Sequence, residues 1–347
     1  MAITDLSDAE LESFVVELDG KPFQARQLAH WIYKQGATTL DECKNIPARL
    51  RDALAAKGPL LGSRLVHNDV STDGTEKLLI ELVGAEGESP ETIETVLIPE
   101  GKRNTLCIST QVGCPVACIF CASGLNGVRR NLTSGEIIEQ VLHARRHNDA
   151  GRNLTNLVVM GIGEPMLNLD NLLQALDRLH DPSGLNFGAR RITVSTSGYP
   201  DRIDRFAEAP HAFNLAISLH AADDALRKRL VPTATASVQE IVDAAKRYAG
   251  RTGRQVTFEV VLLAEVNDRP RDAAVMIHKL RAVPCTVNLL PWNPVSQIPD
   301  LKRPGPLRVS AFAGLLREGG LNVTVRRQRG ADRSAACGQL RIAVSQS

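Results

Sequence analysis

Residues 105–124 read TLCISTQVGCPVACIFCASG, and they introduce a pattern that continues through most of the chain. The stretch begins as a short apolar strand and runs directly into a loop with three cysteines. Further strand candidates follow, namely TNLVVMG, RITVSTSG, FNLAISLH, QVTFEVVLL, CTVNLLPWNP and LNVTVRR. Helical patterns such as SGEIIEQVLHARRH, DNLLQALDRLH and VQEIVDAAKRYAG lie between several of them. This alternation predicts an α/β fold, a partial or full parallel β/α barrel over residues 104–347.

Two smaller regions precede the predicted barrel. Residues 1–70 are expected to form a helical domain, because Ser7 and Glu10 make a capping-box signature and the helical spacing of KPFQARQLAHWIYKQG ends at Gly36. Residues 71–103 hold two strand patterns, EKLLIELV and ETIETVLIPE, joined by a loop with glycine. We therefore expect a β-hairpin that links the helical domain to the barrel.

The composition is that of an ordinary globular chain, with 347 residues, 43% apolar and 23% charged. A formal net charge of +2 gives no overall preference for nucleic acid, so any such contact must come from local basic patches. No apolar run is long enough to cross a membrane, and the N-terminus lacks a signal pattern. We expect no membrane partner and a cytoplasmic location, where clustered cysteines indicate metal binding or catalysis.

Polar and glycine-rich residues gather where the predicted strands end. They form the cysteine loop and the segments GIGEPMLN, STSG, SLH and PWNP. Active sites of parallel β/α folds form at the carboxyl ends of the strands, so these segments are expected to share one pocket. The alternative is that they are polar only because they are loops.

Cys114, Cys118 and Cys121 are spaced C-x3-C-x2-C. A closed structural zinc site needs four ligands, and a cubane iron–sulfur cluster normally takes four thiolates. Three cysteines on a cubane leave one iron free to bind a substrate. Zinc stays open as an alternative, although the nearest additional cysteine, Cys107, is expected inside a strand.

With Phe120 before its last cysteine, this spacing resembles the radical S-adenosylmethionine superfamily, and GIGEP at 161–165 resembles that superfamily's GGE-type motif. An ordered set of segments then resembles the RlmN/Cfr family of RNA adenine methyltransferases: RNTLCISTQVGC, MGIGEPMLN, RRITVSTSG, NLAISLHA, FEVVLLAEVND, VNLLPWNP and AACGQL. QARQLAHWIY also resembles the family's accessory domain, so the resemblance runs from about residue 20 to residue 341. It favours the RlmN branch.

The resemblance implies methylation of carbon 2 of adenine, in 23S rRNA at the peptidyl transferase centre and in tRNA on the 3′ side of the anticodon. It implies a [4Fe–4S] cluster on Cys114, Cys118 and Cys121, two molecules of S-adenosylmethionine per turnover, and an electron donor. Contacts to S-adenosylmethionine carry over to Gly163, Glu164, Ser195, Ser218, Leu219, His220 and Asn293. Radical chemistry suits this reaction, because carbon 2 is electron-poor and a cofactor must do the difficult step.

Three catalytic residues are also implied by the resemblance. Cys337 matches the cysteine that is first methylated; its S-methyl group then loses a hydrogen to a deoxyadenosyl radical and adds to adenine. Cys107 matches the cysteine that resolves the RNA–protein tether and leaves a Cys107–Cys337 disulfide. Glu94 matches the proton acceptor. Without the resemblance, Cys107 is interpreted as a small buried side chain and Glu94 as a residue on a solvated strand face, while Cys43 and Cys285 are expected only to pack.

RNA contact is expected from basic residues near the pocket. The basic groups are Arg129–Arg130, Arg145–Arg146, Arg190–Arg191 and Arg326–Arg327–Arg329. The first follows the cysteine loop and the last leads into Cys337, so both are expected at the pocket mouth, where they could contact phosphates. The target adenine is expected in a loop or extruded from its stack.

One segment departs from the family pattern. RlmN members commonly carry an acidic–aliphatic–acidic triplet before the catalytic cysteine, and here it is Asp332, Arg333 and Ser334. Ser334 leans towards the Cfr branch, so methylation of carbon 8 is one alternative. The others are a non-enzymatic metal-binding RNA-binding protein, which would not need Cys107, Cys337 or GIGEP, and a radical enzyme for a small molecule, which leaves the helical domain unexplained.

Overall fold

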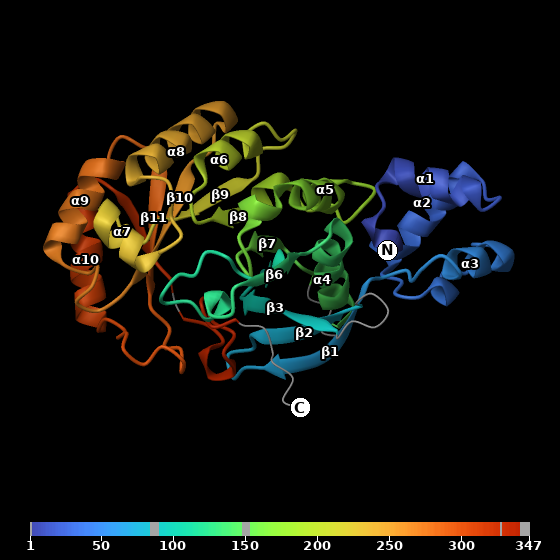
Figure 1. Ribbon diagram of the computed structural model, residues 1–347, viewed down its shortest axis with the longest axis horizontal. Coiled ribbons are helices and arrows are strands. Elements are labelled where there is room, and N and C mark those ends of the chain that lie inside the picture. Colours follow the sequence, from blue (N-terminus) through green and yellow to red (C-terminus); the bar gives the residue numbers. More distant parts are fainter. Residues whose placement is uncertain (1, 84–89, 148–152, 327, 341–347) are drawn as a thin grey trace.

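The computed structural model describes residues 2–83, 90–147, 153–326 and 328–340, and its centre is a mixed ten-stranded sheet (Figure 1). The order of strands is β1-β2-β3-β4-β7-β8-β9-β10-β11-β12. The last seven run parallel to one another. They are β4 (Arg103–Cys107), β7 (Asn156–Val159), β8 (Ile192–Thr196), β9 (Asn214–Ser218), β10 (Val256–Leu262), β11 (Cys285–Pro291) and β12 (Asn322–Val325). Each lies at a predicted strand, and because β1 and β12 are the two ends of the described sheet, the barrel is partial.

Helices connect the parallel strands, as the alternating pattern predicts. They are α4 (Ser134–His147), α5 (Leu169–His180), α6 (Pro200–Phe206), α7 (Asp224–Leu230), α8 (Val238–Thr252), α9 (Pro270–Leu280) and α10 (Pro306–Glu318). In Figure 1, α5, α6, α8, α9 and α10 form an arc outside the strands. Helix α8 shows why they form: Ser237 caps its start by accepting a hydrogen bond from the Glu240 backbone, and Gly253 ends it at φ +67°. None of the described helices is both long and apolar enough to cross a bilayer.

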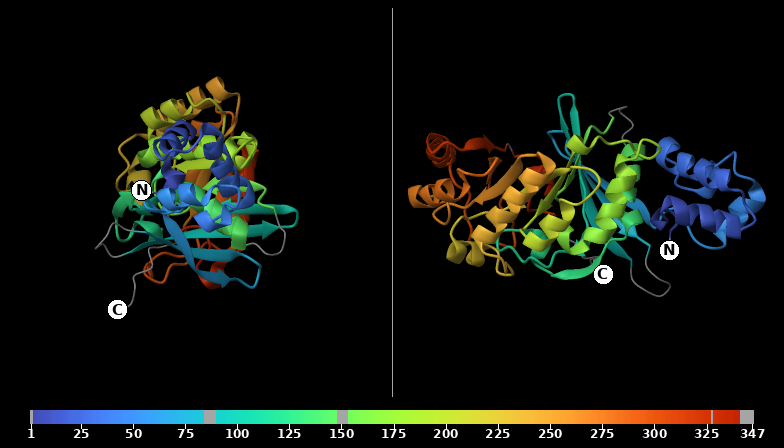
Figure 2. Two further views of the ribbon diagram at one scale, coloured as in Figure 1. Left: turned by 90° about the vertical axis from the view of Figure 1, so that its right-hand side faces the viewer. Right: turned by 90° about the horizontal axis from the view of Figure 1, so that it is seen from above.

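The N-terminal region is a separate group of helices at one end of the molecule (Figure 2). It comprises α1 (Asp8–Glu17), α2 (Pro22–His30), α3 (Ala48–Ala55) and three short helical turns, Ile3–Asp5, Trp31–Gln35 and Leu40–Glu42. The capping box at Ser7 and Glu10 is confirmed, with the Glu10 backbone donating to Ser7 Oγ at 3.3 Å.

The helical region ends earlier than predicted. Residues Ser63–Val70, which were expected to belong to it, form strand β1 and pair antiparallel with β2 (Glu76–Leu82). Their polar side chains carry a weak strand pattern, so pairing with β2 rather than local propensity decides their conformation.

The predicted hairpin of β2 and β3 (Glu91–Glu100) is confirmed, but it is not a free linker. Strand β3 also pairs antiparallel with β4, with Val96 opposite Cys107. Strands β1 to β3 therefore extend the barrel's own sheet, and the hairpin lies directly beside the first strand of the barrel.

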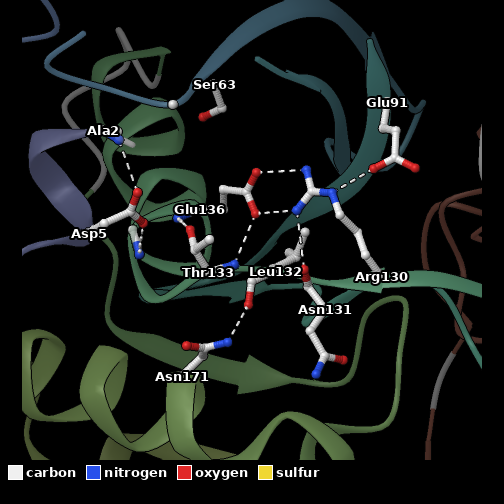
Figure 3. Close-up of polar contacts among 12 residues, drawn as sticks. Ala2, Asp5, Ser63, Glu91, Arg130, Asn131, Leu132, Thr133, Glu136 and Asn171 are labelled. Carbon is white, nitrogen blue, oxygen red and sulfur yellow. Dashed lines mark hydrogen bonds and ion pairs between the residues drawn. The ribbon is translucent and has the colours of Figure 1, made fainter. Parts of the chain in front are cut away.

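Figure 3 shows the polar contacts of Arg130, which lies on the strand that follows the cysteine loop. The loop connects β5 (Gln111–Gly113) with β6 (Val128–Asn131), which pair antiparallel. On β6, Arg130 donates to both carboxylate oxygens of Glu136 on α4, at 2.8 Å each, and to Glu91 on β3 at 2.7 Å. Glu136 also caps α4, because its carboxylate accepts from the Thr133 backbone at 2.9 Å. Arg130 thus joins the hairpin of the cysteine loop to both neighbours.

Replacing Arg130 with alanine is expected to lower the free energy of unfolding by about 1–2 kcal/mol, because two largely buried carboxylates lose their partner. The Glu136 side chain is 9% exposed and that of Glu91 20%, whereas Arg130 is 36% exposed, which reduces the effect. Urea unfolding would measure it. Arg129→Ala is the matched control: this neighbour is 59% exposed and lies 3.9 Å from Glu91. Equal losses for the two variants would contradict the anchoring role.

Candidate active site

The carboxyl ends of the parallel strands surround one open cavity. Its wall draws on every parallel strand or the loop after it, on the cysteine loop and on the segment around Cys337. The shared pocket expected from the polar strand ends is therefore present. Most residues selected from the sequence line it: Cys107, Cys114, Cys118, Cys121, Gly163, Glu164, Ser195, Ser218, His220, Asn293 and Cys337.

Two selected residues do not line this cavity in the described part of the chain. Leu219 is fully buried, and its backbone N–H donates to the Glu259 carbonyl at 3.0 Å. Glu94 lies on β3 and is 5% exposed, so it is not on a solvated strand face. Its carboxylate is 3.0 Å from Lys77 Nζ on β2, an ion pair inside the sheet extension.

The cysteine loop is held rigidly on several sides. The Cys114 backbone donates to the Gly127 carbonyl at 2.9 Å, and Trp292 Nε1 donates to the Phe120 carbonyl at 2.9 Å. Gly113 is required at the start of the loop, because its φ is +81° and a Cβ there would lie 2.0 Å from the Gly127 carbonyl oxygen. The three thiols therefore reach the pocket from a fixed backbone.

The donor set fits a [4Fe–4S] cluster with three protein ligands. Burial raises the pKa of Cys114 to about 12, while the backbone N–H groups of Val116 and Gly163 oppose that rise. Burial likewise raises the pKa of Cys121, against hydrogen bonds from Ser123 and Gly124. Hydrogen bonds from N–H groups stabilise the negative charge of a thiolate. Bound iron would neutralise the rest of that charge, so this environment fits cysteines that hold a cluster. Among the described residues, no three His, Cys, Asp or Glu side chains converge as they would around one metal ion.

The GIGEP loop forms the wall next to the cysteines. Gly163 has a φ of +111°, and a Cβ there would lie 2.8 Å from the Gln111 backbone nitrogen. The Glu164 carboxylate accepts from the backbones of Met166 at 3.0 Å and Ser197 at 2.7 Å, which joins the loops after β7 and β8. Burial raises the pKa of Glu164 in spite of these bonds. The loop presents its backbone to the pocket in one fixed conformation.

His220 and Asn293 complete the opposite wall. His220 Nδ1 accepts from the Val261 backbone at 3.2 Å, and burial lowers the pKa of His220 to about 3, so its ring is neutral. The ring meets Phe120 edge-on at 4.7 Å. Asn293 Nδ2 donates to the Cys337 carbonyl at 3.0 Å, which links this wall to the segment around Cys337.

The structure brings Cys107 and the Cys337 segment together. Cys107 ends β4 and belongs to a packed cluster with Val96, Ile162, Ala335 and Leu340. Burial raises the pKa of Cys107 to about 12, with further contributions from nearby Cys337, which raises it, and Arg326, which lowers it. Both thiols are free, so the disulfide implied by the resemblance is not supported by this structure.

Two charged residues of the pocket were not selected as part of the catalytic site. Glu259 on β10 is 8% exposed, and its carboxylate accepts from Asn288 Nδ2 on β11 at 2.9 Å. Arg326 follows β12 and lines the pocket rather than only its mouth. A lone glutamate inside the apolar run FEVVLL was the signal that could have identified Glu259.

The other basic groups have structural partners or lie far from the pocket. Arg130 is held by two carboxylates, as described above. Arg145 donates to the Tyr33 carbonyl at 2.9 Å and Arg146 binds Glu42 at 2.8 Å, so both join α4 to the N-terminal domain. Arg190 and Arg191 precede β8 and lie at the end of the strand away from the pocket. Arg329 lines a second, smaller cavity beside Cys337. Arg327 lies outside the described residues.

A partial parallel β/α barrel, with three cysteines on the loop after its first parallel strand and an open pocket at the strand ends, defines a radical S-adenosylmethionine enzyme. Residues 108–276 match the radical SAM superfamily, and residues 1–58 match the ribosomal RNA large subunit methyltransferase N-terminal domain.

Relatives that match nearly the full length of this chain identify a narrower family within the class. A probable dual-specificity RNA methyltransferase RlmN from Symbiobacterium thermophilum is 42% identical over 97% of this chain and 90% of its own. One from Thermosynechococcus vestitus is 42% identical over 99% of each chain. The crystal structure of a radical SAM methyltransferase from Sphaerobacter thermophilus is 45% identical, with a TM-score of 0.93 over 98% of this chain and 99% of that one. This chain belongs to the RlmN family of radical SAM RNA methyltransferases, which confirms the resemblance noted in the sequence.

Proposed function

We propose that this protein methylates carbon 2 of adenine in 23S rRNA and in tRNA, through a methyl group carried on Cys337. The observation that supports it most is the placement of Cys337, Cys107 and the three loop cysteines around one pocket. Relatives named as dual-specificity RNA methyltransferases support the use of two RNA substrates. The enzyme acts in the cytoplasm and takes its electrons from a separate donor.

The loop cysteines would hold the cluster, which would supply the electron for reductive cleavage of S-adenosylmethionine. Gly163, Glu164, Ser195, Ser218, His220 and Asn293 line the pocket where that molecule would lie, and Leu219 is buried between Ser218 and His220. Two molecules of S-adenosylmethionine are consumed per turnover: one methylates Cys337, and the other provides the radical.

The catalytic cysteines have complementary roles in this proposal. The Cys337 sulfur takes the methyl group from the first S-adenosylmethionine. A deoxyadenosyl radical removes one hydrogen atom from that methyl group, the methylene carbon bonds to adenine, and the adduct gives up one electron, which the cluster would accept. The Cys107 thiolate then attacks the Cys337 sulfur, so the carbon–sulfur bond breaks, the methylene carbon takes a proton, and a disulfide forms. An external thiol reductant restores both thiols.

Glu94 is proposed to accept the proton that leaves carbon 2. Its carboxylate is buried and lies 3.0 Å from Lys77 Nζ, so a proton taken from the base would pass to a group held in a fixed position. Because Glu94 lies on β3 and outside the cavity wall, this role requires the target base to enter from the β3 side.

The test is anaerobic. The reconstituted enzyme would be given S-adenosylmethionine, a reductant, and either 23S rRNA or tRNA that lacks the modification, and digested nucleosides would be identified by mass spectrometry. 2-Methyladenosine is the expected product. 8-Methyladenosine would favour the Cfr-like alternative raised by Ser334. This residue is exposed, and its backbone φ is +50°. Release of deoxyadenosine with no methyladenosine would mean that RNA is the wrong substrate.

A further inference from the structure

The segment that carries Cys337 is held to the pocket by its neighbours. The Ala122 backbone in the cysteine loop donates to the Gly338 carbonyl at 2.8 Å, and Ser123 Oγ donates to the Leu340 carbonyl at 2.6 Å. Together with the bond from Asn293, these contacts fix the chain on the C-terminal side of Cys337.

A second set of contacts holds the N-terminal side of the segment. The turn between β1 and β2, residues 71–75, touches residues 330–332 directly. The Asp332 carboxylate accepts from Ser71 Oγ and from the Thr72 backbone at 3.2 Å. In the reverse direction, the Asp73 carboxylate accepts from the Gly330 backbone at 3.0 Å. Each side therefore supplies one carboxylate to the other.

The two segments also fit closely as surfaces. Gly330 has a φ of +63°, and a Cβ there would lie 2.8 Å from both Thr75 Cγ2 and Ala335 Cβ. Ala335 packs in the same cluster as Cys107. The turn therefore supports the backbone immediately before Cys337, and that backbone packs against the second catalytic cysteine.

Both carboxylates are charged at neutral pH. Although burial raises it, the pKa of Asp73 is held at about 2 by hydrogen bonds from Thr75 and Gly330. The hydrogen bond from Ser71 lowers the pKa of Asp332. Hydrogen bonds to a charged acceptor are stronger than neutral ones, so both contacts favour the closed position of the segment.

We propose that Asp73 and Asp332 are positioning residues that hold the Cys337 segment over the pocket. The β1–β2 turn thereby sets how often Cys337 meets its methyl donor and Cys107. This inference rests on the proposed role of Cys337 as the methyl carrier. It also distinguishes the three residues that depart from the family triplet. All three are exposed, but Asp332 binds the turn through its carboxylate, whereas among the described contacts the side chains of Arg333 and Ser334 do not.

The first test is the reactivity of Cys337 in the enzyme with its cluster in place. The rate of alkylation by iodoacetamide would be followed by mass spectrometry on the unmethylated Cys337 peptide. Asp73→Ala and Asp332→Ala are expected to raise this rate by about five- to tenfold, as the loss of a charge-assisted hydrogen bond implies. Asp73→Asn keeps an acceptor oxygen for Gly330 but loses the charge, so its rate is expected to lie between those of wild type and Asp73→Ala.

Asp69→Ala is the matched control, because Asp69 lies on β1 outside the turn and is 3.3 Å from His67. If Asp69→Ala raises the rate as much as Asp73→Ala, the effect belongs to the whole hairpin and the inference fails. Ser71→Ala removes only one donor to Asp332, so it keeps the test available should an aspartate variant not fold.

The second test is the initial rate of Cys337 methylation with S-adenosylmethionine. Asp73→Ala and Asp332→Ala should lower this rate while iron per chain stays at the wild-type value, a separation that general unfolding would not produce. Wild-type rates of alkylation and methylation in both variants would overturn the inference. If the wild-type protein never methylates Cys337, the proposed function fails instead, and the alkylation rates still decide whether the turn holds the segment.

Discussion

With Cys107 replaced by alanine, the enzyme is expected to remain covalently joined to its RNA substrate. Cys337 can still be methylated and its methylene carbon can still bond to adenine, but no thiolate is left to attack the Cys337 sulfur. A band of protein plus RNA should accumulate on denaturing gels, and release of methylated RNA should fall by about a hundredfold or more.

Replacing Cys337 with alanine is expected to give the opposite result. No methyl carrier remains, so neither methylated RNA nor the covalent complex should form, and the Cys107→Ala, Cys337→Ala double variant should behave in the same way. Together, the two outcomes would show that Cys337 acts before Cys107 in the reaction. Their position in one pocket does not give that order.

Cys285→Ala is a suitable control, because Cys285 is buried at the start of β11, the end of the strand away from the pocket. It should methylate RNA at the wild-type rate and leave no covalent complex. Methylated RNA from Cys337→Ala would show that the methyl group reaches adenine by another route.

The strands of the barrel could be predicted because each is a short apolar run with a polar end. Strand β1 could not, since Ser63–Val70 is held in a strand by β2 more than by its own side chains. The same limit applies to Glu94. Its sequence neighbours suggest a solvated face, and only the pairing of β2 with β3 places Lys77 beside it.

Charged residues show where local sequence is least informative. Arg129 and Arg130 look equivalent in the sequence, yet Arg130 binds Glu136 and Glu91 while Arg129 is exposed. The partners of a buried charge come from other elements, so its role depends on the fold. The motifs around the cysteines were more informative, because one loop supplies all three thiols.

Glu139 on α4 is the residue whose loss is expected to cost the most stability. It is fully buried, and its carboxylate accepts hydrogen bonds from Thr4 Oγ1, from Ser63 Oγ and from the Gly62 backbone at 2.8 Å. These donors lie in the N-terminal turn and at the start of β1. Glu139→Ala removes the acceptor of the buried Thr4 hydroxyl and of the half-buried Gly62 N–H, and leaves Ser63 with only His143 beside it, so we expect the free energy of unfolding to fall by about 3 kcal/mol.

The glutamine variant isolates the charge. Burial raises the pKa of Glu139 to about 7, so the folded protein keeps this proton at a pH where the unfolded chain has lost it. The resulting stabilisation is complete below the unfolded pKa of about 4.3 and is lost as the pH rises through 7. Glu139→Gln has no proton to lose, so its stability relative to wild type should improve by about 2–3 kcal/mol between pH 4.5 and pH 8.

Urea unfolding of wild type and Glu139→Gln at a series of pH values would measure this difference. His143 lies one turn further along α4, with Nε2 3.0 Å from Ser63 Oγ, and burial lowers the pKa of His143 to about 4. Its contribution is lost as the pH falls from about 6.5 towards 4, and both proteins should show that loss. Glu17→Gln, at an exposed site on α1, should follow wild type throughout. If the stability of Glu139→Gln changes with pH as that of wild type does, the pH dependence does not come from the Glu139 carboxyl group.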